Sequence, residues 1–331
     1  MLYFFLLEMD DSLSPHAHVP EERAFWHAAQ EGRVLVGVAT SLPIVESALR
    51  VAICNDHVRC VSQLLSEMPV LLNSFLNGGC TPLTCAAHAG SVGAAALLLE
   101  AKADINRRDN HAATALGRAA FKGNVGVVQI LLGAKASTDV VASGLFWISA
   151  LHAAAFRGCV DSVQALLRAG ANVNMVDDCA INASTPLHLA ARNGRTAVVQ
   201  MLVNVNADVT WFDRNGFSAL THAAWAGHIA TAAILVAAKA PVDGPRGGPQ
   251  VLHWAVTGKR THFLASLIRA KADVNLTVEN KTPVRKAIET GCTRVMRLLL
   301  KAKAQINFLD VRVAAATKSV AIVQLLRAVQ P

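Results

Sequence analysis

Apolar positions along the chain come in pairs of short runs at helical spacing, and a polar stretch follows each pair. In residues 185–210, Leu187 and Ala190 lie three positions apart, and Val198 and Leu202 lie four apart. This spacing predicts two short amphipathic helices joined by a tight turn. The polar stretch that follows predicts an extended finger that leads to the next pair of helices.

This pattern repeats along the chain at a nearly constant interval. A short phrase opens each pair of predicted helices, and its first residues are Thr81, Thr114, Ser149, Thr185, Ser218, Gln250 and Thr282. Successive phrases are 33, 35, 36, 33, 32 and 32 residues apart. A fixed period in this range indicates a stacked-repeat solenoid, because one such unit cannot bury its apolar face alone.

The ends of the predicted helices carry the expected local signals. Thr185 is a suitable N-cap, and Pro186 suits the first helical position, where its missing N–H would be unpaired in any residue. Gly194 should end the first helix, because glycine readily adopts the left-handed conformation that follows a helix.

The phrase Thr185-Pro186-Leu187-His188 and its period resemble the ankyrin repeat, which has a 33-residue unit with a T-P-L-H signature. The resemblance covers seven contiguous units over roughly residues 77–307, and residues 49–65 fit an eighth with Asp56 in the glycine position. It implies an all-α ankyrin-repeat solenoid of about eight full helix–turn–helix–finger units with degenerate caps. We expect a poorly ordered leader over residues 1–22 and an array over 23–330, with units beginning near 23, 47, 81, 114, 149, 185, 218, 250 and 282 and a C-terminal cap from 309.

One departure from the family pattern recurs at the end of the second helices. The family usually has glycine there, and only Gly170 keeps it; the other residues are Lys102, Lys135, Asn206, Lys239, Lys271 and Lys303. A non-glycine residue at positive φ costs on the order of 1 kcal/mol. Lysine beside the last carbonyls regains roughly 0.3–1 kcal/mol from the helix dipole, so the two effects should partly offset each other.

The sequence contains no pattern that indicates catalysis, a metal site or a cofactor. His152, His188 and His253 fill the fourth place of the repeated phrase, where the resemblance implies that the imidazole ties adjacent fingers together. Asn106, Asn174, Asn275 and Asn307 end the finger phrase; the resemblance implies that such asparagines can be hydroxylated, but a structural role in the turn is the default. Gly-rich phosphate loops, nucleophile elbows and paired metal-ligand spacings are missing. The sequence therefore predicts a protein that is not an enzyme.

Cysteine use and charge add two expectations. The seven cysteines show no regular framework, which predicts reduced thiols and a cytoplasmic protein, with the nucleus left open. Cys54, Cys85 and Cys292 are expected to be small buried residues. The net charge of +8 is uneven: residues 246–331 hold 15 Lys and Arg against 4 Asp and Glu, whereas residues 1–245 hold 16 against 19.

The resemblance implies a concave binding surface lined by the fingers and the ends of the first helices. The positions just before the inter-helix glycine, together with the fingers, give the candidate partner-binding residues Phe121, Lys122, Phe146, Trp147, Phe156, Arg157, Arg192, Arg214, Phe217 and Trp225. Aromatic and arginine side chains dominate the energy of protein interfaces. The alternative is that these rings pack against the neighbouring repeat.

A second candidate surface is the basic C-terminal end of the array, with Lys259, Arg260, Lys281, Arg285, Lys286, Arg294 and Arg297. An acidic peptide, an anionic lipid surface or a nucleic acid could bind there, with strong salt dependence; the alternative is a solvated basic face without a partner. The sequence thus favours a protein–protein interaction scaffold without a small-molecule substrate. A peripheral module on an anionic membrane or nucleic acid is the alternative function.

Overall fold

The computed structural model describes residues 27–32, 42–140, 149–176, 183–244, 250–278, 280–317 and 320–327. The predicted leader over residues 1–22 lies outside these ranges. The chain divides into two compact units, Met1–Asn172 (unit 1) and Val173–Pro331 (unit 2). Both units are built from paired helices in the described residues, which confirms the predicted all-α repeat solenoid.

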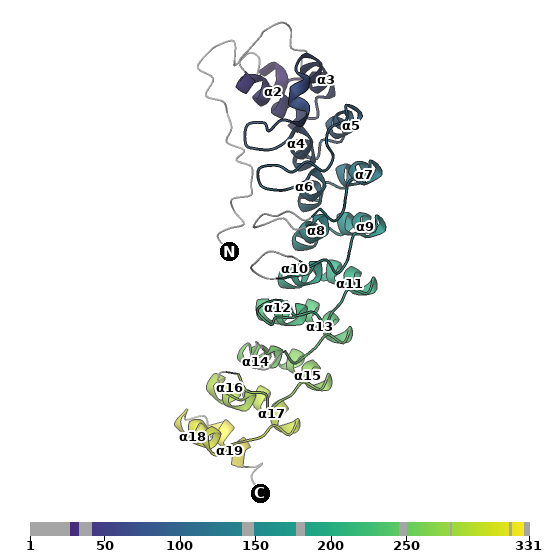
Figure 1. Cartoon of the computed structure of the whole chain (residues 1–331). Helices are drawn as coiled ribbons and strands as arrows, with labels where there is room; N and C mark the ends of the chain where they lie inside the picture. Colours follow the sequence, from purple (N-terminus) through teal and green to yellow (C-terminus); the bar gives the residue numbers. More distant parts are fainter. Residues whose placement is uncertain are drawn as a thin grey trace. The chain divides into compact units, whose positions relative to one another are not determined.

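Unit 1 stacks helix pairs in two layers (Figure 1). Its helices are α2 (Leu42–Cys54), α3 (Val58–Glu67), the 3-10 helix η2 (Pro69–Asn73), α4 (Pro82–Ala89), α5 (Val92–Glu100), α6 (Ala115–Lys122), α7 (Val125–Gly133), α8 (Ala150–Arg157) and α9 (Val160–Arg168). The first helix of each pair packs on the first helix of the next, so that α2, α4, α6 and α8 form one layer. The second helices α3, α5, α7 and α9 form the other layer.

Unit 2 repeats the same arrangement. Its helices are α10 (Pro186–Arg192), α11 (Thr196–Asn204), α12 (Ala219–Ala226), α13 (Ile229–Ala237), α14 (Val251–Thr257), α15 (Thr261–Arg269), α16 (Pro283–Thr290), α17 (Thr293–Lys301), α18 (Phe308–Ala316) and α19 (Val320–Arg327). The even-numbered helices form the layer of first helices, and the odd-numbered helices form the layer of second helices. The fingers connect each second helix to the next first helix.

The first helices begin and end where the sequence predicts. Thr185 is the N-cap of α10 and Pro186 is its first residue, as expected. Gly194 has φ +64° and ends this first helix, which confirms the predicted stop. A side chain could not replace its hydrogen, because a Cβ there would lie 2.6 Å from the ring of His228 in the next repeat.

The second helices end on the residues that the sequence placed in the glycine position. Gly170 and all six substitutes adopt positive φ, with Lys271 at +66° and Asn206 at +60°. The turns between the two helices of a pair also use positive φ. Asp56, between α2 and α3, has positive φ, as its place in the family pattern predicts. In the turn between α14 and α15, Gly258 has an ordinary φ of −77° and Lys259 takes the left-handed conformation instead, at +54°.

The second helices bury the same face in every repeat. Their third, fourth and seventh residues are buried, as Val127, Val128 and Leu131 are in α7. Full burial of one such aliphatic side chain contributes roughly 1.5–3 kcal/mol. None of their second, fifth and ninth residues in the described ranges is buried.

Hydrogen bonds from backbone to side chain join consecutive fingers within each unit. In unit 1 the amide of Ser137 donates to Asn106 Oδ1 over 3.0 Å, and in unit 2 the amide of Gln305 donates to Asn275 Oδ1 over 2.7 Å. The other members of this finger ladder are Asp104 to Asn73, Asn172 to Asp139, Asp208 to Asn174 and Asp273 to Asp243. The structural role expected for the finger asparagines is therefore confirmed for Asn106, Asn174 and Asn275, while Asn307 caps α18 instead.

Among the described residues, we find no helix that combines the length and the apolar character needed to cross a membrane.

Candidate functional site

In unit 1, the candidate binding residues cluster at the ends of α6 and α8. The half-buried rings of Phe121 and Phe156 stack with centroids 6.3 Å apart and planes inclined by 10°. The guanidinium carbon of Arg157 lies 5.0 Å from the centroid of Phe121, within the range of a cation–π contact. Lys122 is exposed beside them. The structure thus brings together all four of the described candidates in this unit.

The inner edges of these rings also contribute to packing between repeats. Phe121 packs against the buried residues Ala113 and Ala153, which come from the finger before α6 and from α8. Phe121 is therefore partly core and partly accessible. The other two candidates expected in this region, Phe146 and Trp147, lie outside the described residues.

In unit 2, the most exposed aromatic candidate is Trp225 in the last turn of α12. Its side chain is 51% exposed, and its ring meets the ring of Trp254 edge to face with centroids 6.3 Å apart. Arg192 is exposed at the end of α10, two residues before the left-handed Gly194. Sequence reasoning missed Trp254, because it considered only the fingers and the positions next to the inter-helix turn, and Trp254 lies inside α14.

The finger before α12 is a tight turn that presents Arg214 and Phe217. The carboxylate oxygen Asp213 Oδ1 accepts hydrogen bonds from the amides of Asn215 and Phe217, each over 2.9 Å. Arg214 is exposed at the tip, and the half-buried ring of Phe217 stacks on His222 with centroids 5.0 Å apart. The finger is thereby anchored to the first helix that follows it.

A second contact from the same aspartate strengthens this anchor. Asp213 Oδ2 lies 2.8 Å from His222 Nε2, nine residues further along the chain. Asp109 and Arg118 have the same separation and the same role in unit 1, where Arg118 Nε donates to Asp109 Oδ2 over 2.8 Å. We call these two pairs finger clamps. Sequence reasoning missed both, although the nine-residue spacing of Asp before a basic residue is visible in the sequence.

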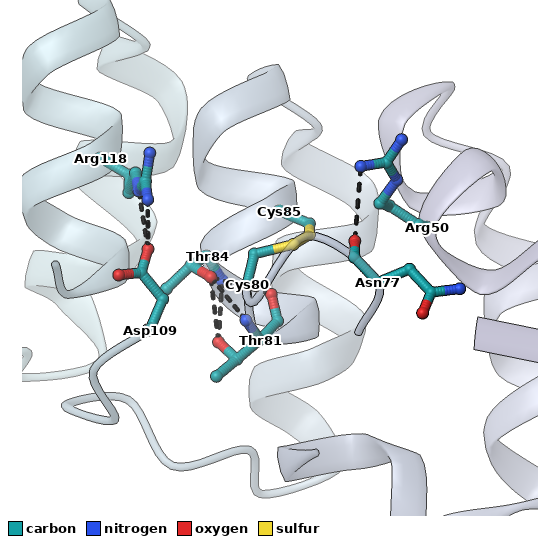
Figure 2. Close-up of a disulfide and its surroundings, with 8 residues drawn as sticks. All are labelled: Arg50, Asn77, Cys80, Thr81, Thr84, Cys85, Asp109 and Arg118. Atoms are coloured by element: carbon teal, nitrogen blue, oxygen red, sulfur yellow. Dashed lines mark hydrogen bonds and ion pairs between the residues drawn. A yellow bond between two sulfur atoms is a disulfide. The ribbon is translucent and has the colours of Figure 1, made fainter. Parts of the chain in front are cut away.

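At the repeat before Asp109 and Arg118, a disulfide joins Cys80 to Cys85 (Figure 2). Cys80 precedes the N-cap Thr81, and Cys85 holds the same place in α4 that Arg118 holds in α6. The prediction that all cysteines are reduced is therefore wrong for this pair. Cys54 was expected to be buried and is exposed, and Cys292 is half-buried.

His253 bonds to the next finger as the resemblance implies, whereas His188 and His152 contact the N-cap hydroxyl of their own repeat. His188 Nδ1 lies 2.8 Å from Thr185 Oγ1, and His152 Nδ1 lies 2.9 Å from Ser149 Oγ. His253 Nε2 donates to the carbonyl of Lys281 in the next finger over 3.0 Å. These contacts place the rings inside the array.

Burial controls the protonation of the histidines in unit 2. Desolvation, with a smaller effect from the neighbouring His222, lowers the pKa of His188 from 6.5 to about 4. Desolvation also lowers the pKa of His222, although Asp213 opposes that shift, and the pKa of His253. The neutral forms are therefore the ones that the folded array accommodates.

The structure separates the candidate basic residues into groups. Lys281 Nζ lies 2.9 Å from Glu289, and Arg285 Nε lies 2.9 Å from the buried Asp310, so both cations are paired within the protein. Lys286 is half-buried.

The remaining basic candidates lie at two other places. Lys259 and Arg260 form the turn between α14 and α15, where the guanidinium of Arg260 packs over Gly227. Arg294 and Arg297 line a hollow between α15 and α17.

The described residues contain no group of three or more His, Cys, Asp or Glu side chains arranged to hold a metal ion.

Comparison with known proteins identifies the repeats. A model of ankyrin repeats, in three copies, matches residues 25–109, 49–143 and 151–246. The chain is 31% identical over 124 residues to the ankyrin repeat and KH domain-containing protein mask-1 of Caenorhabditis elegans, covering 38% of this chain and 5% of the relative. It is 34% identical over 144 residues to mouse Rabankyrin-5, covering 41% of this chain and 12% of the relative.

The matched segments thus span only a small part of both relatives. Ankyrin repeats generally mediate protein–protein interaction, and the family is typically non-catalytic. The family model covers more than half of the residues, and the structure shows the corresponding helix pairs. The chain belongs to the ankyrin-repeat family.

Proposed function

We propose that this chain is a non-catalytic scaffold that captures another protein on the surface formed by its fingers and first helices. We call the corresponding surface of each unit its finger face; it comprises Phe121, Lys122, Phe156 and Arg157 in unit 1 and Arg192, Arg214, Phe217 and Trp225 in unit 2. The proposal takes the cytoplasm as the place of action.

The exposure of Trp225 is the observation that carries this proposal. An indole that is half exposed leaves a large apolar area available to a partner. Tryptophan and arginine are enriched among the residues that dominate interface energies, because they present a large apolar area with a polar group. The arginines at the finger tip and at the end of α10 fit the same role.

The stacked rings in unit 1 support the proposal in a second way. The contact between Phe121 and Phe156 holds both rings in fixed positions, and Arg157 covers one of them. A rigid aromatic surface loses little side-chain entropy when it is covered by a partner. The alternative function, in which the basic C-terminal repeats bind an anionic membrane or a nucleic acid, receives less support. Lys281 and Arg285 are already paired with acids.

The test is quantitative affinity purification with the full chain as bait. Trp225→Ala and Phe156→Ala should each lose the same set of captured proteins, while Gln200→Ala, an exposed change on the second helix α11, should retain them. Reconstitution with one recombinant partner should then show a loss of about 2 kcal/mol or more for Trp225→Ala. Retention of every partner by both aromatic variants, with unchanged circular dichroism, would refute a role for the finger face.

A further inference from the structure

The second-helix layer of unit 2 contains a hollow of about 350 Å³ between α15 and α17. Its lining includes Thr261 and Ala265 from α15 and Leu298 from α17, all half-buried. Most of this lining is apolar. The hollow lies on the layer of second helices, so it is separate from the finger face.

Three exposed cations surround this apolar floor. Arg294, Arg297 and Lys301 occupy the second, fifth and ninth places of α17, and all three line the hollow. His262 adds a fourth polar side chain from α15. Among the described residues these cations take part in no ion pair, and the acids Glu289 and Asp310 pair with Lys281 and Arg285.

The other second helices show that the repeat does not require these charges. The second, fifth and ninth places of α7, α11 and α13 are exposed, and these helices fill them only with Gly, Ala, Gln and Asn. Within the described ranges, α17 alone has a cation at all three places. Three like charges on one helix face repel each other by a few tenths of a kcal/mol per pair, so this choice costs a little stability and calls for another explanation.

We propose that the hollow between α15 and α17 binds an acidic segment of a partner protein, in which an apolar side chain is flanked by carboxylates. The apolar side chain occupies the floor over Ala265 and Leu298. The flanking carboxylates pair with the guanidinium groups of Arg294 and Arg297 and with the ammonium of Lys301.

The shape and chemistry of the hollow favour a peptide over other anions. A bare phosphate or a nucleic-acid backbone needs hydrogen-bond donors around the whole anion, whereas this floor offers mainly carbon. An anionic membrane surface contacts cations that lie in one plane. It would not reach the floor of a concave site between two helices, so the apolar floor would stay uncovered. An acidic peptide with an apolar anchor matches both the rim and the floor.

Fluorescence anisotropy with the full chain tests the proposal. The probe is a labelled peptide that alternates pairs of glutamate with single leucines. Two control peptides replace the leucines by serine or the glutamates by glutamine, and each should bind at least tenfold more weakly. Affinity for the probe should fall as the salt concentration rises, because the ion pairs are exposed and screened.

Matched variants locate the site. Lys301→Glu and Arg168→Glu make the same charge change at the last place of α17 and α9, and both residues are exposed. Lys301→Glu combined with Arg297→Glu should weaken the probe roughly tenfold, since exposed ion pairs contribute about 0.2–1 kcal/mol each. Arg168→Glu should leave the affinity within twofold of the original. Ala265→Gln fills the floor without changing the charge. It should lower the affinity for the leucine probe and leave the affinity for the serine control unchanged.

Several outcomes overturn the proposal. One is an equal effect of Lys301→Glu and Arg168→Glu, which would show a general attraction to positive charge. Another is equal binding of the leucine and serine peptides, which would show that the floor is unused. Binding of phosphatidylserine vesicles or single-stranded RNA at concentrations where the peptide does not bind would assign the surface to a different class of partner. None of these measurements involves the finger face, so they leave the proposed function to its own test.

Discussion

At the scale of single residues, the array holds lysines in a backbone conformation that glycine usually adopts. The five lysines that follow the second helices hold φ between +62° and +69°. Their backbone amides donate to the last turn of the preceding helix, as Lys271 does to the carbonyl of Ile268 over 3.0 Å. The strain at each site is small, and the exposed ammonium lies near the negative end of the helix dipole.

Replacement of Lys271 by glycine should leave the stability of unit 2 nearly unchanged or raise it slightly. Glycine relieves roughly 1 kcal/mol of strain at positive φ, but it adds about 0.4–1 kcal/mol of chain entropy to the unfolded state and removes the charge. Urea unfolding measures the difference. Lys271→Ala keeps the strain and removes the ammonium, so it should be the less stable of the two variants; a clear loss of stability in Lys271→Gly alone would show that the lysine makes a further contact.

Buried histidines make unit 2 sensitive to acid. The pKa of His188 is about 4 in the folded chain against an ordinary 6.5, so the unfolded chain binds the extra proton between these values. Its contribution is fully present above pH 6.5 and is lost as the pH falls toward 4. Between about pH 7 and pH 5 the free energy of unfolding should fall by about 2 kcal/mol from this residue.

Urea unfolding across this range of pH checks the acid sensitivity. His188→Gln removes the titrating group and should flatten the profile between pH 6.5 and 5, even if it lowers stability at pH 7. An unaltered slope in this variant would place the acid sensitivity elsewhere, with His222 and His253 as the next groups to replace.

At the scale of elements, three fingers are fastened to the first helix that follows them, each by different chemistry. Asp109 and Arg118 form a buried ion pair, and Asp213 binds His222. The repeat before them uses the Cys80–Cys85 disulfide at the start of α4 (Figure 2). Because this fastening fixes the finger, it also fixes the aromatic and basic side chains that the finger face presents.

Removal of one partner from a buried pair should be more costly than reduction of the disulfide. Asp109→Ala leaves Arg118 buried without its carboxylate and should destabilise unit 1 by about 3 kcal/mol. Reduction of Cys80–Cys85 opens a short loop and should cost about 2 kcal/mol by the chain-entropy model. Urea unfolding with and without dithiothreitol measures both effects.

The control for the disulfide is Cys85→Ala, whose stability should not respond to dithiothreitol. Equal sensitivity of the original chain and this variant would show that the reductant acts elsewhere. For the ion pair, Arg118→Leu together with Asp109→Ala should recover part of the loss, because the uncompensated charge is then gone.

At the scale of the whole molecule, the sequence predicted the repeat and its ends far better than the contacts between fingers and helices. The caps at Thr185 and Gly194 are encoded by residues adjacent in the chain, and the period made them recognisable. The clamps could not be found in the same way, because the residues at those two positions change from one repeat to the next. What they share is a distance along the chain, nine residues between Asp109 and Arg118 and between Asp213 and His222.

The sequence named some residues of the candidate surfaces but not the residues that they contact in space. The family pattern located Phe121, Phe156 and Trp225, but it gave no information on Trp254, which pairs with Trp225. Charge counting correctly identified residues 246–331 as strongly basic and could not reveal that Asp310 and Glu289 neutralise two of the cations. Whether a cation is paired with an acid depends on which side chains meet in space, and composition does not give this information.

The finger ladder has a consequence for how such a chain can change in length. Each of its hydrogen bonds needs a specific acceptor side chain, such as Asn106, but the donor is a main-chain amide, which every residue except proline supplies. A duplicated or deleted repeat therefore brings or removes its own acceptor and finds a suitable donor in any neighbour. The finger ladder therefore sets no requirement on the donor side when whole repeats are gained or lost.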